Sequence, residues 1–288
     1  MPVVDATWDP HQYLRHADHR SRPFVDLLAR VPELPASGRP PRIADLGCGP
    51  GNVTRLLTAR WPTAHVTGFD NSPAMLARAD ELAGPTEGGG RLDFAQADAT
   101  AWTPPPGRYD LILSNATLQW VPGHTTSFPA WTAALTPGGT FAFQVPGNFD
   151  APSHVLMRDL AASPRWRDRL GDVLRHADAV LSPGAYLERL ADLGCEVDAW
   201  ETTYQHLLAG EDPVLDWVKG TGLRPVLTAL SDDASATKKF LDEYGTLLRE
   251  AYPPTPHGTV FPFRRVFAVA RRTDAPCGNH LEFLEPLA

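Results

Sequence analysis

The sequence of 288 residues is 43% hydrophobic and 21% charged, which is the balance of an ordinary globular protein. Its formal net charge is −8 and no block is rich in lysine or arginine, so a nucleic-acid partner is disfavoured. The chain contains no apolar run of the roughly 18 residues that a membrane-spanning helix needs. We therefore expect neither nucleic acid nor membrane as a partner.

The cysteines and the N-terminal segment indicate the compartment. The three cysteines lie far apart without a CxxC pair, and the first residues carry no continuous apolar core. We expect a reduced, cytoplasmic protein that is a monomer or a weak dimer. No HxxE, CxxC or HExxH motif occurs, so we expect no catalytic metal.

The first part of the chain predicts an alternation of strands and helices. Residues 1–40 are expected to form an N-terminal helical segment over the active site, with a helix or helix pair at residues 9–31. From residue 42 apolar strands alternate with amphipathic helices, which is typical of an open parallel sheet covered on both faces. Ser72 and Pro73 suit the N-cap and the first position of a helix. The predicted strands are 42–47, 64–70, 91–98, 109–116 and 140–147, and the predicted helices are 52–61, 72–83 and 129–139.

After residue 148 this rhythm breaks. Helical patterns with proline interruptions predominate. One long strand pattern, 196–208, lies between two helical regions, and a second, 259–272, follows them. We predict an α/β fold with a doubly wound, mostly parallel, seven-stranded Rossmann-like sheet and an inserted helical cap. The expected divisions are the N-terminal segment, a cofactor-binding core at 41–150, the cap with two returning strands at 151–272, and a loose tail at 273–288.

A glycine-rich turn follows the first strand. Gly47, Gly49 and Gly51 give the spacing GxGxG instead of the dinucleotide pattern GxGxxG. Asp45 beside them would repel a pyrophosphate but would suit the ammonium group of a methionine moiety. Asp70, at the end of the next strand, is placed to accept hydrogen bonds from two ribose hydroxyls. The ligand that fits is S-adenosylmethionine; a nicotinamide cofactor or a merely structural turn is the alternative.

Other residues near the strand ends complete the predicted cofactor site. Asp98 and the Ala99 backbone could bind the adenine amino group, although an aspartate in this position also suits a simple turn. Met75 could cover the adenine face or be an ordinary core residue. We also assign Asn71 and Asn115 to this site, since ligands bind at the carboxyl ends of parallel strands.

Several segments resemble known proteins. The first half is similar to class I S-adenosylmethionine-dependent methyltransferases, which implies the cofactor but not the substrate. Six further segments lie between Trp8 and Arg272: "WDPHQYLRHADHRSRP", "SNATLQWVPGH", "QVPGNFDAPSH", "VDAWETTYQHLL", "VLDWVKGTGLRP" and "FPFRRVFAVA". Together they resemble the trans-aconitate methyltransferase family. That resemblance implies transfer of a methyl group to one carboxylate of trans-aconitate, giving a monomethyl ester and S-adenosylhomocysteine.

A carboxylate substrate and a hydroxyl substrate predict different side chains. A carboxylate is already ionised at pH 7 and needs no general base, but its other carboxylates need cations that position them. Arginine binds carboxylates through two parallel hydrogen bonds. Arg264 and Arg265 are adjacent on a strand, so at most one of them faces the site unless the strand bulges. The expected substrate-binding residues are Arg20, Gln119, Arg224, Arg264 and Arg265.

Three residues are candidates for catalytic roles. Tyr204 and His206 share one strand face with Thr202 and could donate hydrogen bonds to a carboxylate. His206 could instead act as a base on a hydroxyl of another small acid or natural product. Trp120 could line the methyl-transfer site or belong to the core. A protein that binds S-adenosylmethionine without catalysis is a further alternative.

Overall fold

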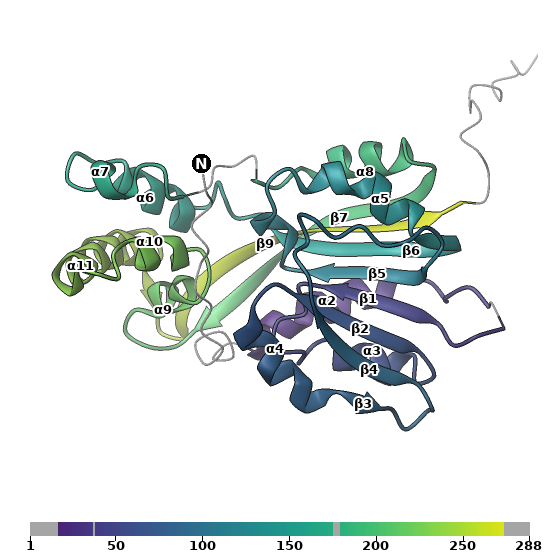
Figure 1. Cartoon of the computed structure of the whole chain (residues 1–288). Coiled ribbons are helices and arrows are strands. Elements are labelled where there is room, and N and C mark those ends of the chain that lie inside the picture. The colour runs from purple at the N-terminus through teal and green to yellow at the C-terminus, as the bar shows by residue number, and fades with distance from the viewer. Residues whose placement is uncertain (1–16, 37, 175–178, 274–288) are drawn as a thin grey trace, which may run out of the picture.

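The computed structural model describes residues 17–36, 38–174 and 179–273 (Figure 1). The predictions for residues 1–16 and for the tail beyond residue 273 lie outside these ranges. In the described part of the chain, helix α2 (Ala17–Arg30) precedes the sheet. No helix of this part is both long and apolar enough to cross a membrane.

One mixed sheet organises the described chain. Its strands follow the order β3-β4-β2-β1-β5-β6-β9-β7, and β8 pairs with β9. The strands β4, β2, β1, β5 and β6 run parallel, whereas β9 is antiparallel to both β6 and β7. Seven of the described strands have five residues or more, and β3 and β8 have two residues each. This mixed, mostly parallel sheet confirms the predicted fold class. The bounds are β1 Arg42–Leu46, β2 His65–Asp70, β3 Gly84–Pro85, β4 Arg91–Gln96, β5 Tyr109–Asn115, β6 Leu135–Pro146, β7 Cys195–Leu208, β8 Pro254–Thr255 and β9 Gly258–Arg272.

Helices cover both faces of this sheet (Figure 1). Alternate residues of β6 enter opposite cores: Phe143 packs with α5 and α8, whereas Ala142 belongs to the cluster that includes α2 and α3. The Ser72 hydroxyl accepts a hydrogen bond from the Met75 amide at the start of α4, so the predicted N-cap is confirmed. The helices are α3 Arg55–Arg60, α4 Pro73–Ala79, α5 Phe128–Ala133 and α8 Pro183–Ala191, with 3-10 turns Asp80–Leu82, Leu118–Trp120 and His124–Ser127.

Two elements differ from the sequence-based expectation. The helix predicted at 129–139 ends at Ala133, and β6 already begins at Leu135. Pro137 disfavours helical backbone at the residue before it, and Thr136 is extended with its hydroxyl bonded to Asp110. Helix α8 packs on β7 within the core of the sheet, so it covers the sheet and is not part of the cap.

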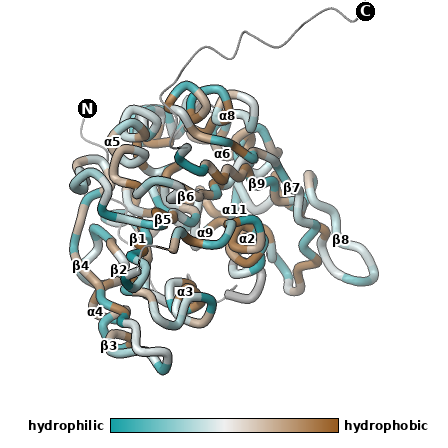
Figure 2. The backbone as a smooth tube through the Cα atoms, turned by 90° about the vertical axis from the view of Figure 1, so that its right-hand side faces the viewer, coloured by the Kyte–Doolittle hydropathy of each residue, from teal (hydrophilic) through white to brown (hydrophobic). Residues whose placement is uncertain are grey.

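The other described helices form a separate layer beyond one end of the sheet (Figure 1). Their apolar cluster includes Trp217, Phe240 and Tyr244, together with Phe261 and Phe263 of β9. Strand β9 pairs with β6 only from Arg265 to Arg271, but with β7 from Thr259 to Arg272. Beyond Arg265 the hairpin of β7 and β9 extends past β6 and packs against the cap helices. Strand β8 pairs with β9 and lies at the outer edge of the molecule (Figure 2). The cap helices are α6 Pro152–Ala161, α7 Arg167–Leu170, α9 Pro213–Lys219, α10 Arg224–Ala229 and α11 Ala234–Ala251.

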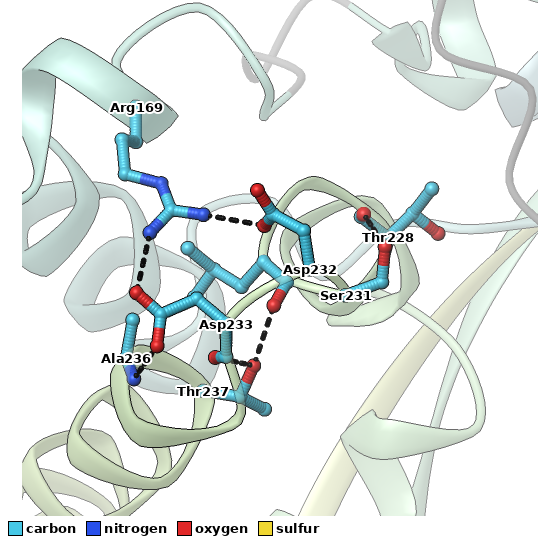
Figure 3. A network of polar contacts seen from close by, with 8 residues as sticks. Arg169, Thr228, Ser231, Asp232, Asp233, Ala236 and Thr237 are labelled. Atoms are coloured by element: carbon cyan, nitrogen blue, oxygen red, sulfur yellow. Dashed lines mark hydrogen bonds and ion pairs between the residues drawn. The ribbon is translucent and has the colours of Figure 1, made fainter.

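An ion-pair network joins two parts of the cap (Figure 3). Arg169 of α7 donates to Asp232 at 2.7 Å and to Asp233 at 3.1 Å. Asp233 also caps α11, because its other oxygen accepts from the Ala236 amide at 2.9 Å. That amide hydrogen bond lowers the pKa of the Asp233 carboxyl. The network therefore holds α7 against the start of α11.

A buried carboxylate ties together the amino ends of three strands. Asp110 of β5 is fully buried, and its oxygens accept from Arg39 Nη1 at 2.8 Å and from Nη2 at 3.2 Å. They also accept from the Arg42 amide at 2.8 Å and the Thr136 hydroxyl at 2.9 Å. Charge-assisted hydrogen bonds of this kind are among the stronger ones in proteins.

We expect Asp110→Asn to lower the free energy of unfolding by about 3 kcal/mol, because the amide cannot accept all four hydrogen bonds and leaves Arg39 without its charge partner. Urea denaturation measures this change. Asp93→Asn is the control: Asp93 pairs with Arg91 at the surface, so its loss should cost less than about 1 kcal/mol. Equal effects of the two substitutions would contradict the assigned role of Asp110.

Candidate active site

The glycine turn after β1 has the backbone that its sequence predicts. Gly47 has a φ of 75° and Gly49 a φ of 56°, both in the left-handed region that favours glycine. A Cβ atom at Gly47 would lie 2.0 Å from the Thr117 Oγ1, whereas one at Gly49 would meet nothing within 4 Å. The turn therefore packs tightly against the end of β5 on one side and leaves open space beside Gly49. At Gly51 (φ 76°) a Cβ would lie 2.7 Å from the ring of Phe94.

Asp45, two residues before Gly47, is buried. It is 1% exposed, and its Oδ2 accepts from the Thr54 hydroxyl at 2.7 Å. Its Oδ1 has no hydrogen-bond partner within the described residues. Burial raises the pKa of the carboxyl to about 7. A cationic ligand group would satisfy the open oxygen and stabilise the carboxylate form, so the site fits an ammonium group.

Asp70, at the end of β2, orders the turn itself. Its Oδ2 accepts from the Gly49 amide and its Oδ1 from the Ser72 amide, each at 2.9 Å. Burial raises the pKa of this carboxyl as well. Each carboxylate oxygen can accept a second hydrogen bond, so the carboxylate can still receive hydroxyl donors beside the open side of Gly49.

Four other predicted cofactor residues lie in α4 or in the segments after β2 and β4, and they vary in exposure. Asp98 is exposed, and its carboxylate accepts a hydrogen bond from the Thr100 amide at 2.8 Å. This hydrogen bond belongs to a local turn, which is the alternative to adenine binding that the sequence left open. The Met75 side chain is buried, and Asn71 is exposed with its carbonyl 3.3 Å from Gln96 Nε2. Ala99 is half-buried. The roles of these residues toward a cofactor stay predictions.

A cavity opens between the sheet and the cap, at the carboxyl ends of β5 and β6. Four predicted site residues line it: Asn115, Gln119, Trp120 and Arg265. It adjoins the glycine turn, because Ala116 lines the cavity and the hydroxyl of the next residue, Thr117, donates to the Gly47 carbonyl at 3.3 Å. The cap contributes His154, Met157, Arg158, Leu174, Trp217, Thr221, Gly222 and Pro225, and Pro146, Phe149 and Phe263 complete the lining.

A buried polar chain supports one wall of this cavity. Arg265 is 5% exposed and its Nη1 donates to Gln144 Oε1 at 3.3 Å. The Gln144 amide group in turn donates to Asn115 Oδ1 at 2.6 Å. The guanidinium also lies 4.6 Å from the centre of the Phe263 ring. These contacts fix the Arg265 guanidinium and the Asn115 amide at the cavity surface.

The backbone after β5 adopts an uncommon conformation. Ala116 has a φ of 55°, which is rare for a residue other than glycine. Its amide donates to the Gln144 carbonyl at 2.9 Å and its carbonyl accepts from Gln119 Nε2 at 2.6 Å. These hydrogen bonds hold the strained turn, which aims Gln119 and Trp120 at the cavity.

Two of the other predicted substrate-binding arginines, Arg264 and Arg224, do not line this cavity. Arg264 points away from it and forms an ion pair with Glu201, with a further bond to the Gly147 carbonyl, so strand alternation leaves only Arg265 at the site. Arg224 begins α10 and lies outside the lining, although its neighbour Pro225 belongs to it. Arg20 lies in α2, and its side chain is outside the described part of the structure.

Tyr204 and His206 are structural residues in this arrangement. The Tyr204 hydroxyl donates to Asp26 Oδ2 at 2.6 Å, which joins β7 to α2, and burial raises the pKa of the phenol. The His206 ring packs 4.7 Å from that of Trp217, and neither residue lines the cavity. We therefore do not retain them as catalytic residues.

The sequence did not lead us to predict three polar residues that line or support the cavity. Gln144 interrupts an apolar strand, and this break in the pattern was a usable signal. His154 and Arg158 lie one turn apart on α6 and both line the cavity, but nothing in their helical pattern distinguishes them from surface residues. The described residues contain no group of three His, Cys, Asp or Glu side chains that could hold a metal ion, and the prediction of no catalytic metal stays a prediction.

The sheet order, the glycine turn and the acids at the strand ends define a class I methyltransferase fold. A methyltransferase domain model matches residues 43–139. A chain of the complex between the Haloferax volcanii Trm112 methyltransferase activator and a putative methyltransferase superposes with a TM-score of 0.52 at 18% identity, covering 96% of this chain and 100% of that one. A putative sarcosine dimethylglycine methyltransferase from Galdieria sulphuraria gives 0.51 at 16% identity, covering 95% and 94%.

Sequence relatives are much more similar. The trans-aconitate 2-methyltransferase of Streptomyces avermitilis is 71% identical over 94% of this chain and 99% of its own length. That of Streptomyces coelicolor is 67% identical over 95% and 89%. One from Rhodococcus jostii is 50% identical over 92% and 99%. The chain belongs to the trans-aconitate 2-methyltransferase family.

Proposed function

We propose that this protein transfers the methyl group of S-adenosylmethionine to a carboxylate of trans-aconitate and forms its monomethyl ester. The observation that carries the proposal is the buried guanidinium of Arg265 in a cavity that adjoins the glycine turn. A cationic wall next to a cofactor site suits a polycarboxylate, and the relatives named above are trans-aconitate 2-methyltransferases. A cytoplasmic location and a monomeric or weakly dimeric state are part of the proposal.

The residues at the strand ends fit the cofactor. Asp45 would bind the ammonium group through its open Oδ1, and Asp70 would accept hydrogen bonds from the ribose hydroxyls. The open side of Gly49 gives room for the ligand backbone. Asp98 and Ala99 would bind the adenine edge, with Met75 and Asn71 beside the nucleoside and Asn115 near the methionine end. When bound, S-adenosylmethionine supplies an electrophilic methyl group on a positively charged sulfur.

The reaction needs positioning but no base. A carboxylate oxygen of the substrate donates an electron pair to the methyl carbon while the carbon–sulfur bond breaks toward sulfur. The products are a neutral ester group and a thioether, and no proton moves. Arg265 holds and orients the substrate, the Asn115–Gln144 chain keeps Arg265 in place, and Trp120 excludes water from the cavity.

A hydroxyl substrate would require a general base at the cavity. His206, the base considered from the sequence, does not line it, whereas His154 does. An alternative activity on another small acid or a hydroxyl would therefore depend on His154 and not on His206.

Methyl transfer from labelled S-adenosylmethionine to trans-aconitate, cis-aconitate, citrate, fumarate and several phenols tests the proposal. We expect rapid esterification of trans-aconitate, with much slower transfer to the other compounds. Transfer to a phenol but to no acid would replace the proposed substrate with a hydroxyl. Binding of S-adenosylmethionine without transfer to any compound would favour a non-catalytic binding protein.

We expect Arg265→Gln to raise the KM for trans-aconitate at least about tenfold, because a charge-assisted hydrogen bond contributes about 1.5 to 3 kcal/mol. Arg264→Gln is the matched control, since the neighbouring guanidinium binds Glu201 outside the cavity. Its KM should stay within about threefold of the wild-type value. Steady-state kinetics at saturating S-adenosylmethionine measure both values. An unchanged KM in Arg265→Gln would exclude this residue from the substrate site.

The affinity for S-adenosylmethionine should rise with pH between about 5.5 and 7. Below its pKa of about 7, Asp45 is protonated and must lose its proton to pair with the ammonium group. The Kd should therefore fall by up to about tenfold per pH unit, since the ligand's amino group remains charged in this range.

Isothermal titration calorimetry of the wild-type protein and Asp45→Asn measures this dependence. The variant should bind at least about tenfold more weakly at pH 7 and show a flat profile, because its amide does not titrate. Asp93→Asn, at the surface of β4, should keep the wild-type profile. A wild-type slope in Asp45→Asn would assign the pH dependence to another group.

A further inference from the structure

Helix α6 brings a second guanidinium to the cavity. Arg158 lines it one helical turn after His154, on the same face of the helix. Its side chain forms no ion pair or hydrogen bond with the residues that the structure describes. In contrast, Arg165 and Arg169, on the neighbouring part of the cap, both form ion pairs with acidic residues.

The position of Arg158 is set by the packing of α6. The first turn of this helix is held by two tyrosines: the Ser153 amide donates to the Tyr252 hydroxyl at 3.0 Å, and the Tyr244 hydroxyl donates to the Ser153 carbonyl at 2.5 Å. A Cβ atom at Gly222 would lie 3.1 Å from His154 Nε2, so the α9–α10 connection also approaches the helix closely. Arg158 therefore projects from a fixed element into the cavity.

Two guanidinium groups that line one cavity repel each other unless an anion lies between them. Arg265 comes from the sheet and Arg158 from the cap, so they approach the cavity from different layers. A ligand with two separated carboxylates could give each guanidinium its own charge partner, because the two arginines approach from different layers.

We propose that Arg158 is a specificity-determining residue that binds one carboxylate of the substrate while Arg265 binds another. This inference rests on the proposed function, and it names the contact by which the enzyme distinguishes a tricarboxylate from smaller acids. Arg158 does not take part in the bond changes. Its loss should weaken substrate binding and leave the rate of methyl transfer at saturation nearly unchanged.

Arg158→Gln and two dicarboxylate analogues of trans-aconitate test the inference. Mesaconate lacks the carboxymethyl carboxylate, and itaconate lacks the carboxylate at the opposite end. Each is used as a competitive inhibitor of trans-aconitate methylation by the wild-type protein and the variant. We expect Arg158→Gln to raise the KM for trans-aconitate at least about tenfold, with kcat within about threefold.

Where Arg158 binds the central carboxylate, which both analogues keep, both Ki values should rise; where it binds an end carboxylate, the Ki of the analogue that lacks it should be the same in both proteins. The Ki of the other should rise with the KM. Arg158→Lys should restore part of the affinity, since it keeps the charge without the planar fork. Arg167→Gln, at an exposed ion pair on α7, is the control and should behave as the wild type.

The Kd for S-adenosylmethionine and the melting temperature of Arg158→Gln should match the wild-type values, which separates lost substrate binding from lost folding. If the wild type methylates trans-aconitate but Arg158→Gln and Arg158→Lys keep its KM, the inference is wrong and the proposed function stands. If the wild type does not methylate trans-aconitate, both fail.

Discussion

The unequal pairing of β9 determines where the site lies. This strand pairs with β6 only as far as the pair Pro146–Arg265, but it continues with β7 to Thr259. Beyond Arg265 the hairpin leaves the sheet and places Phe261 and Phe263 in the core of the cap. Arg265 therefore lies at the fork between two layers, where its side chain can face a cavity without leaving the support of the sheet.

The parallel half of the fold could be predicted because its signals are local. Apolar runs, glycine turns and the Ser72 cap each depend on residues close in sequence. Which helices cover the sheet and which form the cap depends on contacts between residues far apart in the sequence. Helix α8 has the same amphipathic character as α6 and α11, and only its contacts with β7 show that it covers the sheet. Amphipathicity predicts that a helix buries one face, but it does not identify the layer that the face contacts.

The two parts of the candidate site differ in the same way. Asp45 is the second-last residue of β1 and Asp70 the last residue of β2, so their approach to the glycine turn follows from parallel topology alone. Tyr204 and His206 share one face of β7, but that face is covered by α2 and Trp217. Arg158 enters the cavity through the packing of a distant helix, and its sequence neighbourhood carries no sign of this contact.

Charge is separated across the site in a way that suits methyl transfer between ions. Carboxylates at the ends of β1 and β2 lie beside the glycine turn, and guanidinium groups from β9 and α6 line the cavity. The short strained segment at Ala116 lies between them. A negative protein can thus hold a polyanion, because local cations outweigh a screened net charge. Since the reacting sulfonium and carboxylate lose their charges together, a dry cavity favours the uncharged products over the separated ions.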